Sequence, residues 1–204
     1  MSDNRVVLDL ETQKTFDEVG GRNAMDKLGI SVVGLYEYNT DKFSVFYEKD
    51  LGRLQNILID ASLIVGFNHI FFDMPVLQPY LSVDVKQLPC FDIMLDLQEK
   101  LGHRIGLNAV ASATLGVGKI ASGLDAIRFY REGQWDKLKE YCISDVDITK
   151  QVFEYGIKNS KLMYKSRFGQ AIKEVKVKWS AYNKRQVVKK LEETPGAEAQ
   201  YTLF

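Results

Sequence analysis

Cysteine, histidine and long apolar runs are scarce in this 204-residue sequence. It contains two cysteines and two histidines, too few to predict a zinc site, and Cys90 and Cys142 lack the CxxC spacing of a metal or redox pair. We expect both to be reduced residues of the core. No apolar run approaches the roughly 20 residues that cross a membrane, and the first residues show no secretory signal. The sequence therefore predicts a cytoplasmic protein.

Net charge is also lacking, because 27 basic side chains balance 27 acidic ones, but the charges are unevenly distributed. Residues 1–160 carry 17 basic and 23 acidic side chains, whereas residues 161–190 carry 10 basic and one acidic. An acidic body joined to a basic segment indicates metal ligands in the first and a polyanion contact in the second. The alternative is a basic segment that only keeps an outer face solvated.

Hydrophobic residues make up 46% of the sequence, which predicts a large folded domain rather than a disordered chain. Short β-branched segments predict strands, and apolar residues at helical spacing predict helices. We expect strands at 5–10, 29–38, 42–47 and 63–67, and helices at 51–61, 74–80, 90–101, 107–115, 124–131 and 135–159. Their order predicts a mixed sheet with helices on its faces.

Beyond residue 160 the apolar residues alternate with charged ones, which is a strand pattern. Segments 161–166 and 174–179 predict a C-terminal β-hairpin across a glycine-containing turn. This hairpin closes a predicted domain of residues 1–180. We expect a basic helical extension at 181–193 and a flexible tail at 194–204, which begins with the linker sequence TPGA.

Two acids stand two positions apart at the end of the first predicted strand. Side chains at positions i and i+2 share one face of a strand, so Asp9 and Glu11 project to the same side. Burying two carboxylates together is costly unless a cation neutralises them. The pair indicates a metal site, although a solvated strand end would show the same spacing.

Two further motifs contain an aspartate, one at a predicted strand-to-helix junction and one on the long predicted helix. Asp73 closes the segment GFNHIFFD, after the predicted strand 63–67 and at the start of a predicted helix. The helix dipole favours a carboxylate there, so an N-cap role is the alternative to a catalytic one. On the long helix, Tyr141 and Asp145 are four residues apart and share one face.

In chain order these motifs are DxE, NxxxFD and YxxxD, on a strand, a strand-to-helix junction and a helix. The joint pattern resembles the Tyr-containing branch of the DEDD superfamily of 3′–5′ exonucleases, above all the exonuclease domains of family B DNA polymerases. The segments FDEVGG (16–21), TLGVGK (114–119) and FYREGQWDKLKEYCISDV (129–146) are also similar to that group. The resemblance spans roughly residues 5–179 and implies an RNase H-like fold.

The resemblance also implies two Mg²⁺ or Mn²⁺ ions bound by oxygen ligands. By position, Asp9 would bridge both ions, and Glu11 and Asp145 would complete the site of the ion that binds the attacking water. Asp73 would act on the second ion. Tyr141 would orient the water for in-line attack on the terminal phosphodiester. These five residues are the predicted catalytic set, and the four acids are the predicted metal ligands.

Four neighbouring residues are predicted to contact the substrate strand. Leu10 and Thr12 would do so through their backbone, and Asn68 matches an asparagine upstream of the family's second acid. Phe72 is the fourth, although a place in the core suits it better.

The predicted function is that of a metal-dependent 3′–5′ exonuclease acting on single-stranded or frayed DNA ends in repair or replication. The basic hairpin and tail would bind phosphates, and this binding would weaken as salt rises. Two alternatives stay open. One is an exoribonuclease acting on RNA 3′ ends, and the other is a nucleic-acid-binding module that has lost its chemistry.

The last five residues, QYTLF, resemble the clamp-binding pentapeptide of bacterial replication and repair proteins. Leu203 and Phe204 would anchor in an apolar pocket, and Gln200 would supply directional hydrogen bonds. A bacterial-type sliding clamp is therefore the predicted protein partner, which favours DNA as the substrate. Fold-back of the tail onto its own domain is the alternative.

Overall fold

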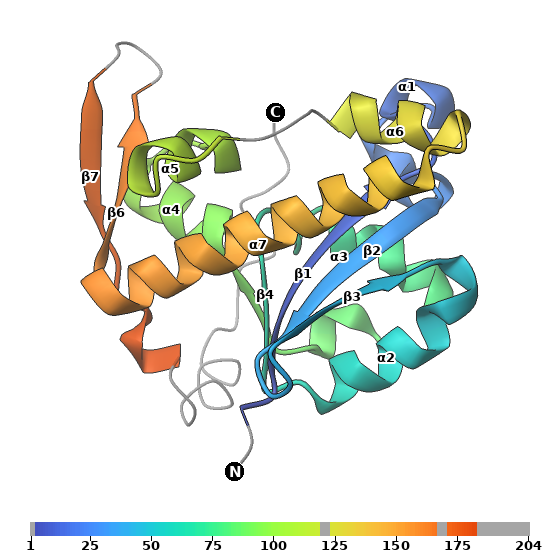
Figure 1. Cartoon of the computed structure of the whole chain (residues 1–204), viewed down its shortest axis with the longest axis horizontal. Coiled ribbons are helices and arrows are strands. Elements are labelled where there is room, and N and C mark those ends of the chain that lie inside the picture. The colour runs from blue at the N-terminus through green and yellow to red at the C-terminus, as the bar shows by residue number, and fades with distance from the viewer. Residues whose placement is uncertain (1–2, 119–122, 167–170, 183–204) are drawn as a thin grey trace.

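A five-stranded mixed sheet forms the centre of the molecule (Figure 1). The computed structural model describes residues 3–118, 123–166 and 171–182. The order of the strands in the sheet is β3-β2-β1-β4-β5. Their bounds are Arg5–Thr12 for β1, Ile30–Glu37 for β2, Lys42–Phe46 for β3, Leu63–Gly66 for β4 and Cys90–Asp92 for β5.

Two pairing modes meet at β1, the central strand. β1, β2 and β3 form an antiparallel meander, whereas β1, β4 and β5 run parallel. The carboxyl ends of these three parallel strands therefore lie along the same edge of the sheet. This arrangement confirms the mixed sheet that the sequence predicts.

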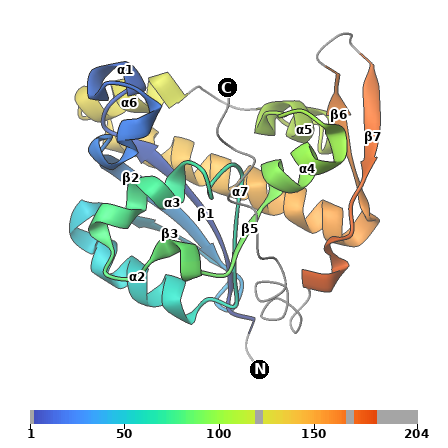
Figure 2. The ribbon, with the colours of Figure 1, turned by 180° about the vertical axis from the view of Figure 1, so that it is seen from behind.

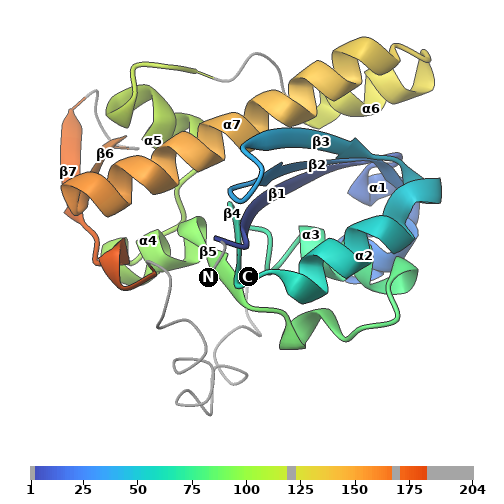
Figure 3. The same ribbon diagram turned by 60° about the horizontal axis from the view of Figure 1, so that its bottom comes forward.

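Helices cover both faces of the sheet. The long helix α7 crosses one face, and α2 and α3 lie on the other (Figures 2 and 3). The helices are α1 (Phe16–Val19), α2 (Leu51–Asp60), α3 (Asp73–Leu77), α4 (Ile93–Leu101), α5 (Leu107–Thr114), α6 (Gly123–Arg131) and α7 (Trp135–Asn159). Short 3-10 turns are η1 (Arg22–Lys27), η2 (Glu48–Asp50), η3 (Gln78–Tyr80), η4 (Val85–Gln87) and η5 (Trp179–Tyr182). Among the described residues, no helix combines the length and the apolar character needed to cross a membrane.

The alternation of side-chain direction along β1 decides on which face of the sheet Asp9 and Glu11 lie. Leu8 and Leu10 belong to the apolar cluster that β1 shares with α2 and α3, and Val7 belongs to the cluster it shares with α7. Because side chains alternate along a strand, Asp9 and Glu11 have the parity of Val7. Both carboxylates therefore lie on the face that α7 crosses.

A glycine in β2 allows α7 to lie close to the sheet. A Cβ atom on Gly34 would stand 2.9 Å from both the Cys142 sulfur and a methyl carbon of Val146. The Cys142 Sγ in turn lies 3.6 Å from the main-chain oxygen of Asp9. This close approach brings the third and fourth turns of α7 directly over the acidic end of β1.

The expected helix at 90–101 is wrong in its first three residues. Cys90 to Asp92 form strand β5, which pairs in parallel with β4, and the helix begins only at Ile93. A short apolar run has no period that separates a buried strand from a helix turn. The pairing with β4 decides the conformation instead.

The predicted C-terminal hairpin is confirmed, with a shorter second strand. β6 (Lys161–Lys165) pairs antiparallel with β7 (Ile172–Lys176), and the hairpin lies beside α5 (Figure 1). The predicted strand pattern continues to Trp179, but Trp179 begins η5 instead. Its indole packs against Gly156, where an added Cβ would stand 2.2 Å from the ring, and its Nε1 donates to Asp96 at 2.8 Å.

Three predicted segments fall wholly or mainly outside the described residues. They are the hairpin turn at 167–170, the basic extension at 181–193, of which only the first two residues are described within η5, and the tail at 194–204. The last segment contains Gln200, Leu203 and Phe204.

Candidate active site

Three carboxylates from two elements meet on the α7 face of the sheet. Asp9 and Glu11 come from β1, and Asp145 comes from α7. One carboxylate oxygen from each residue lies within 4.8 Å of those from the other two. The i, i+2 spacing on a strand and the close approach of α7 thus bring together three of the four predicted metal ligands.

The surroundings of this carboxylate cluster make it costly without a cation. Glu11 is 8% exposed and Asp145 is 3% exposed, so solvent screens their mutual repulsion weakly. Three hard oxygen donors within this distance suit Mg²⁺ or Mn²⁺. The donor set therefore fits the divalent cation that the sequence predicts.

Tyr141 stands one helical turn before Asp145 and is 3% exposed. Burial, followed by the negative charges of the three nearby carboxylates, raises the pKa of its hydroxyl well above the ordinary value. Tyr141 therefore stays protonated at neutral pH and keeps an O–H donor beside the carboxylate cluster.

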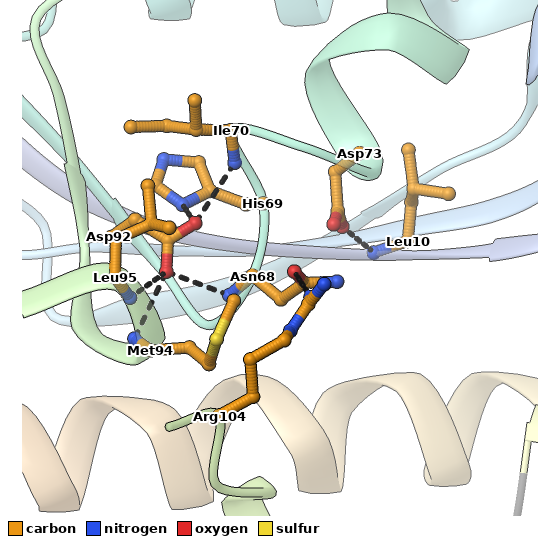
Figure 4. Close-up of polar contacts among 9 residues, drawn as sticks. All are labelled: Leu10, Asn68, His69, Ile70, Asp73, Asp92, Met94, Leu95 and Arg104. Atoms are coloured by element: carbon orange, nitrogen blue, oxygen red, sulfur yellow. Dashed lines mark hydrogen bonds and ion pairs between the residues drawn. The ribbon is translucent and has the colours of Figure 1, made fainter. Parts of the chain in front are cut away.

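Asp73, the fourth predicted ligand, is held next to this cluster rather than within it. Its Oδ1 accepts a hydrogen bond of 2.9 Å from the backbone N–H of Leu10, the residue after Asp9 (Figure 4). Helix α3 begins at Asp73 with Phe72 as its N-cap residue, and no side chain caps it. Burial raises the pKa of Asp73 to about 7, against the opposing effects of His69 and the Leu10 N–H.

A further buried acid, Asp92, was missed in the sequence and organises the edge beside Asp73. Its carboxylate accepts backbone N–H bonds from Asn68 and Ile70, at 2.8 and 3.0 Å, and from Met94 and Leu95 at the start of α4, at 2.9 and 3.2 Å (Figure 4). Asp92 thus caps α4 and ties the loop after β4 to it. An aspartate directly before an apolar helical run is the signal that would have revealed this cap.

His69 completes this second centre. It is fully buried, and its Nδ1 lies 3.5 Å from Oδ2 of Asp92. Burial is the largest single effect and lowers the pKa of His69, but Asp92 and Cys90 together outweigh it and raise that pKa to about 10. Burial likewise raises the pKa of Asp92, yet His69 and the backbone donors hold that pKa below its ordinary value. The two side chains therefore face each other in the core, and a protonated His69 would form a buried ion pair with Asp92.

Asn68, a predicted substrate contact, is fixed from both sides. Its φ of 67° is left-handed, its backbone N–H is bound to Asp92, and its side-chain oxygen accepts a hydrogen bond from Arg104. Arg104 lies in the loop between α4 and α5, and sequence reasoning did not single it out.

The other predicted substrate contacts lie in the same region of the sheet. The Leu10 side chain is buried against the α2 and α3 layer, and its N–H is bound to Asp73. The hydroxyl of Thr12 donates to the main-chain oxygen of Lys14 at 2.9 Å. Phe72 is half-buried and meets Phe16 edge to face, with ring centroids 5.8 Å apart. Their predicted contacts with a strand stay predictions.

A comparison of the sequence with known protein families shows which family this chain belongs to. Residues 6–157 match the sequence profile of the RNase H superfamily. The chain belongs to the RNase H superfamily. No curated protein sequence matches it. The predicted RNase H-like fold is thereby confirmed.

Two solved structures are similar to this RNase H superfamily member. One is the family B DNA polymerase from the hyperthermophilic archaeon Pyrobaculum calidifontis, with a TM-score of 0.58 and 15% identity. The other is RNase D from Trypanosoma brucei, with a TM-score of 0.57 and 19% identity. Each match covers 75% of this chain, which spans 24% of the polymerase chain and 57% of the RNase D chain. Both agree with the resemblance to DEDD exonucleases at the level of the fold.

Proposed function

We propose that this chain is a metal-dependent exonuclease that removes nucleotides from the 3′ ends of single-stranded or frayed DNA. The observation that carries the proposal is the carboxylate cluster of Asp9, Glu11 and Asp145, with the protonated Tyr141 beside it. Membership of the RNase H superfamily and the two exonuclease-like neighbours in fold support it.

Each residue has a role in this proposal. Asp9, Glu11 and Asp145 would hold one divalent cation, and Asp9 together with Asp73 would hold a second. When bound, the cations stabilise negative charge on the attacking and leaving oxygens of the phosphodiester. The Tyr141 hydroxyl orients the attacking water, because it remains a neutral donor among carboxylates. Asn68, held by Arg104 and Asp92, positions the terminal nucleotide.

Burial of the cluster favours cleavage at chain ends. Glu11, Asp145 and Tyr141 are all nearly inaccessible, so a scissile phosphate reaches them only when its strand is unpaired and flexible. A paired duplex is too stiff for one of its strands to bend away and reach this buried cluster. The proposed substrate is therefore a free or frayed 3′ end.

Direction and metal dependence are tested together on a single-stranded DNA oligonucleotide labelled at its 5′ end. We expect a ladder of products that shorten one nucleotide at a time, complete inhibition by EDTA, and recovery on adding Mg²⁺ or Mn²⁺. Short labelled fragments released at once would indicate 5′ trimming or internal cleavage. Strand binding without any metal-dependent cleavage would favour the silent binding module.

RNA is the second candidate substrate, because RNase D from Trypanosoma brucei is among the structural neighbours. Selection between the two sugars depends on contacts around the terminal 2′ position. DNA and RNA oligonucleotides of the same sequence, digested side by side, separate the two functions. We expect the DNA strand to be degraded faster, and faster loss of the RNA strand would reverse the assignment.

Recruitment by a sliding clamp is proposed on sequence grounds, since Gln200, Leu203 and Phe204 lie outside the described residues. A five-residue epitope binds modestly, on the order of micromolar, and a ring that encircles DNA raises the local concentration of the enzyme near 3′ ends. This would place the activity in DNA repair or replication. Deletion of residues 200–204 should abolish co-elution with a bacterial sliding clamp and leave digestion of free oligonucleotides unchanged. A full-length protein that fails to co-elute would rule this partner out.

A further inference from the structure

A groove of about 580 Å³ opens beside Asn68, between the loop that precedes α5 and the end of β6. Three side chains of basic type line it, those of His103, Arg104 and Lys165. No acidic residue is among the described residues that form its walls. The part of the chain before the hairpin carries an excess of acids, so this basic groove stands out against its surroundings.

A second groove, on the other side of Asn68, provides the contrast. It is larger, about 1420 Å³, and shares both Asn68 and Arg104 with the basic groove. Its walls include three acids, Asp92, Asp96 and Glu99, against two basic residues, Arg22 and the shared Arg104. A polyanion that reaches Asn68 is therefore attracted along the basic groove and meets acidic side chains in the larger one.

The strand register places the basic groove next to the catalytic edge. β1 and β4 pair in parallel with Val7 opposite Val65, and β4 ends at Gly66. Neighbouring strands lie about 4.8 Å apart. Phe67 follows β4 directly and lines the basic groove, so the groove begins at the end of the strand next to β1, which carries Asp9 and Glu11.

The floor and walls of the groove differ in chemistry. Met94 and Ile105 are buried apolar residues that line it together with the half-buried Phe67. Arg104 already donates through Nη2 to Asn68, but a guanidinium has five N–H donors in a fork that matches phosphate oxygens. Lys165 is exposed at the end of β6 and supplies a second cation.

We propose that this groove binds the substrate strand on the 5′ side of the nucleotide that is removed, with Arg104 and Lys165 contacting successive phosphates. This inference rests on the proposed function and adds the path of the strand to it. The apolar floor accommodates sugars and bases without selecting their sequence. The volume lies within the 300–1,000 Å³ typical of ligand sites, which suits a short stretch of strand rather than a duplex.

Binding is measured without catalysis, by fluorescence anisotropy of a labelled single-stranded DNA 12-mer in EDTA over a range of salt concentrations. For single strands, the logarithm of the affinity falls with slope of about −0.7 per phosphate neutralised. We expect Arg104→Ala and Lys165→Ala each to lower that slope by about 0.7 and to raise Kd about eightfold at 50 mM salt. The matched control is Lys49→Ala, an exposed lysine in η2 outside both grooves, which should bind the strand as the wild type does.

Two further variants separate charge from folding. Arg104→Lys keeps the positive charge and should recover most of the affinity and the slope. Lys165→Glu changes an exposed side chain, so the fold is retained, and the loss should exceed that of Lys165→Ala. Unchanged Kd and slope in both alanine variants, or an equal loss in Lys49→Ala, would overturn the groove assignment.

This design keeps the two proposals apart. A wild-type protein that binds the 12-mer through Arg104 and Lys165 but never degrades it with Mg²⁺ or Mn²⁺ would refute the exonuclease and leave the groove standing. A wild-type protein that degrades the strand while both alanine variants bind it normally would refute only the groove.

Discussion

Two acidic centres at the same edge of the sheet hold negative charge in opposite ways. Asp92 accepts four backbone N–H bonds and pairs with His69, and the net result is a pKa below the ordinary value. In the carboxylate cluster, Asp9, Glu11 and Asp145 stand within 4.8 Å of one another.

The comparison teaches how to separate a structural acid from a functional one. A buried carboxylate that is satisfied by the protein itself stabilises the fold, and its removal leaves donors unpaired. Carboxylates that face one another repel, so a cation from outside lowers their energy and removal of one carboxylate relieves repulsion. Activity and stability should therefore respond in opposite directions at the two centres.

The largest expected effect is on activity. Asp9→Ala should lower metal-dependent cleavage by about 10⁴-fold or more, because it removes the ligand proposed to serve both cations. In metal-free buffer its midpoint of thermal unfolding should equal or exceed that of the wild type, since one of three like charges is gone. Asp147→Ala is the matched control, because Asp147 lies two residues after Asp145 on α7 and accepts a hydrogen bond from Gln151 of the same helix. Normal cleavage by Asp9→Ala would show that the cluster is not the catalytic centre.

Asp92→Ala should give the reverse pattern at the other centre. It leaves a buried histidine and several N–H groups without their acceptor, which should lower the free energy of unfolding by about 3–5 kcal/mol. Urea unfolding followed by circular dichroism measures the loss. A variant as stable as the wild type, with cleavage abolished, would move Asp92 from the structural centre to the catalytic one.

Tyr141→Phe sharpens the comparison within the carboxylate cluster. The variant keeps the ring and loses only the hydroxyl, so turnover should fall by about a hundredfold as the water is misplaced. Strand affinity measured in EDTA should stay within about twofold of the wild type. Equal losses in affinity and turnover would assign Tyr141 a structural role.

A further expected effect is a pH dependence of stability at the His69 and Asp92 pair. The pKa of His69 is raised from its ordinary 6.5 to about 10 in the folded protein. The folded state thus binds the proton more tightly than the unfolded state, so the stabilisation is complete below about pH 6.5 and is lost as the pH rises through about 10. The gap in unfolding free energy between wild type and His69→Gln should shrink over this range. A gap that stays constant from pH 6 to 10.5 would mean that His69 is neutral.

Much of the fold follows from local pattern. The apolar strands on either side of the acids, the 25-residue helix α7 and the hairpin all have a clear period in the sequence. The start of β5 does not, because Cys90 and Phe91 fit a helix or a strand equally well until β4 is placed beside them. The end of β7 was misjudged for a similar reason, since the docking of Trp179 against Gly156 turns the chain away from the ladder.

The candidate site divides in the same way. The sequence by itself determined that Asp9 and Glu11 share a face, and that Tyr141 and Asp145 share another, because both relations depend only on the periods of a strand and a helix. Only the tertiary structure decided that these faces meet, through the approach of α7 over Gly34. The tertiary structure also decided that the Leu10 N–H donates to Asp73 and that backbone N–H groups donate to Asp92. It likewise placed Arg104 and Lys165 in the lining of one groove. Such contacts join residues dozens of positions apart, and no local period records them.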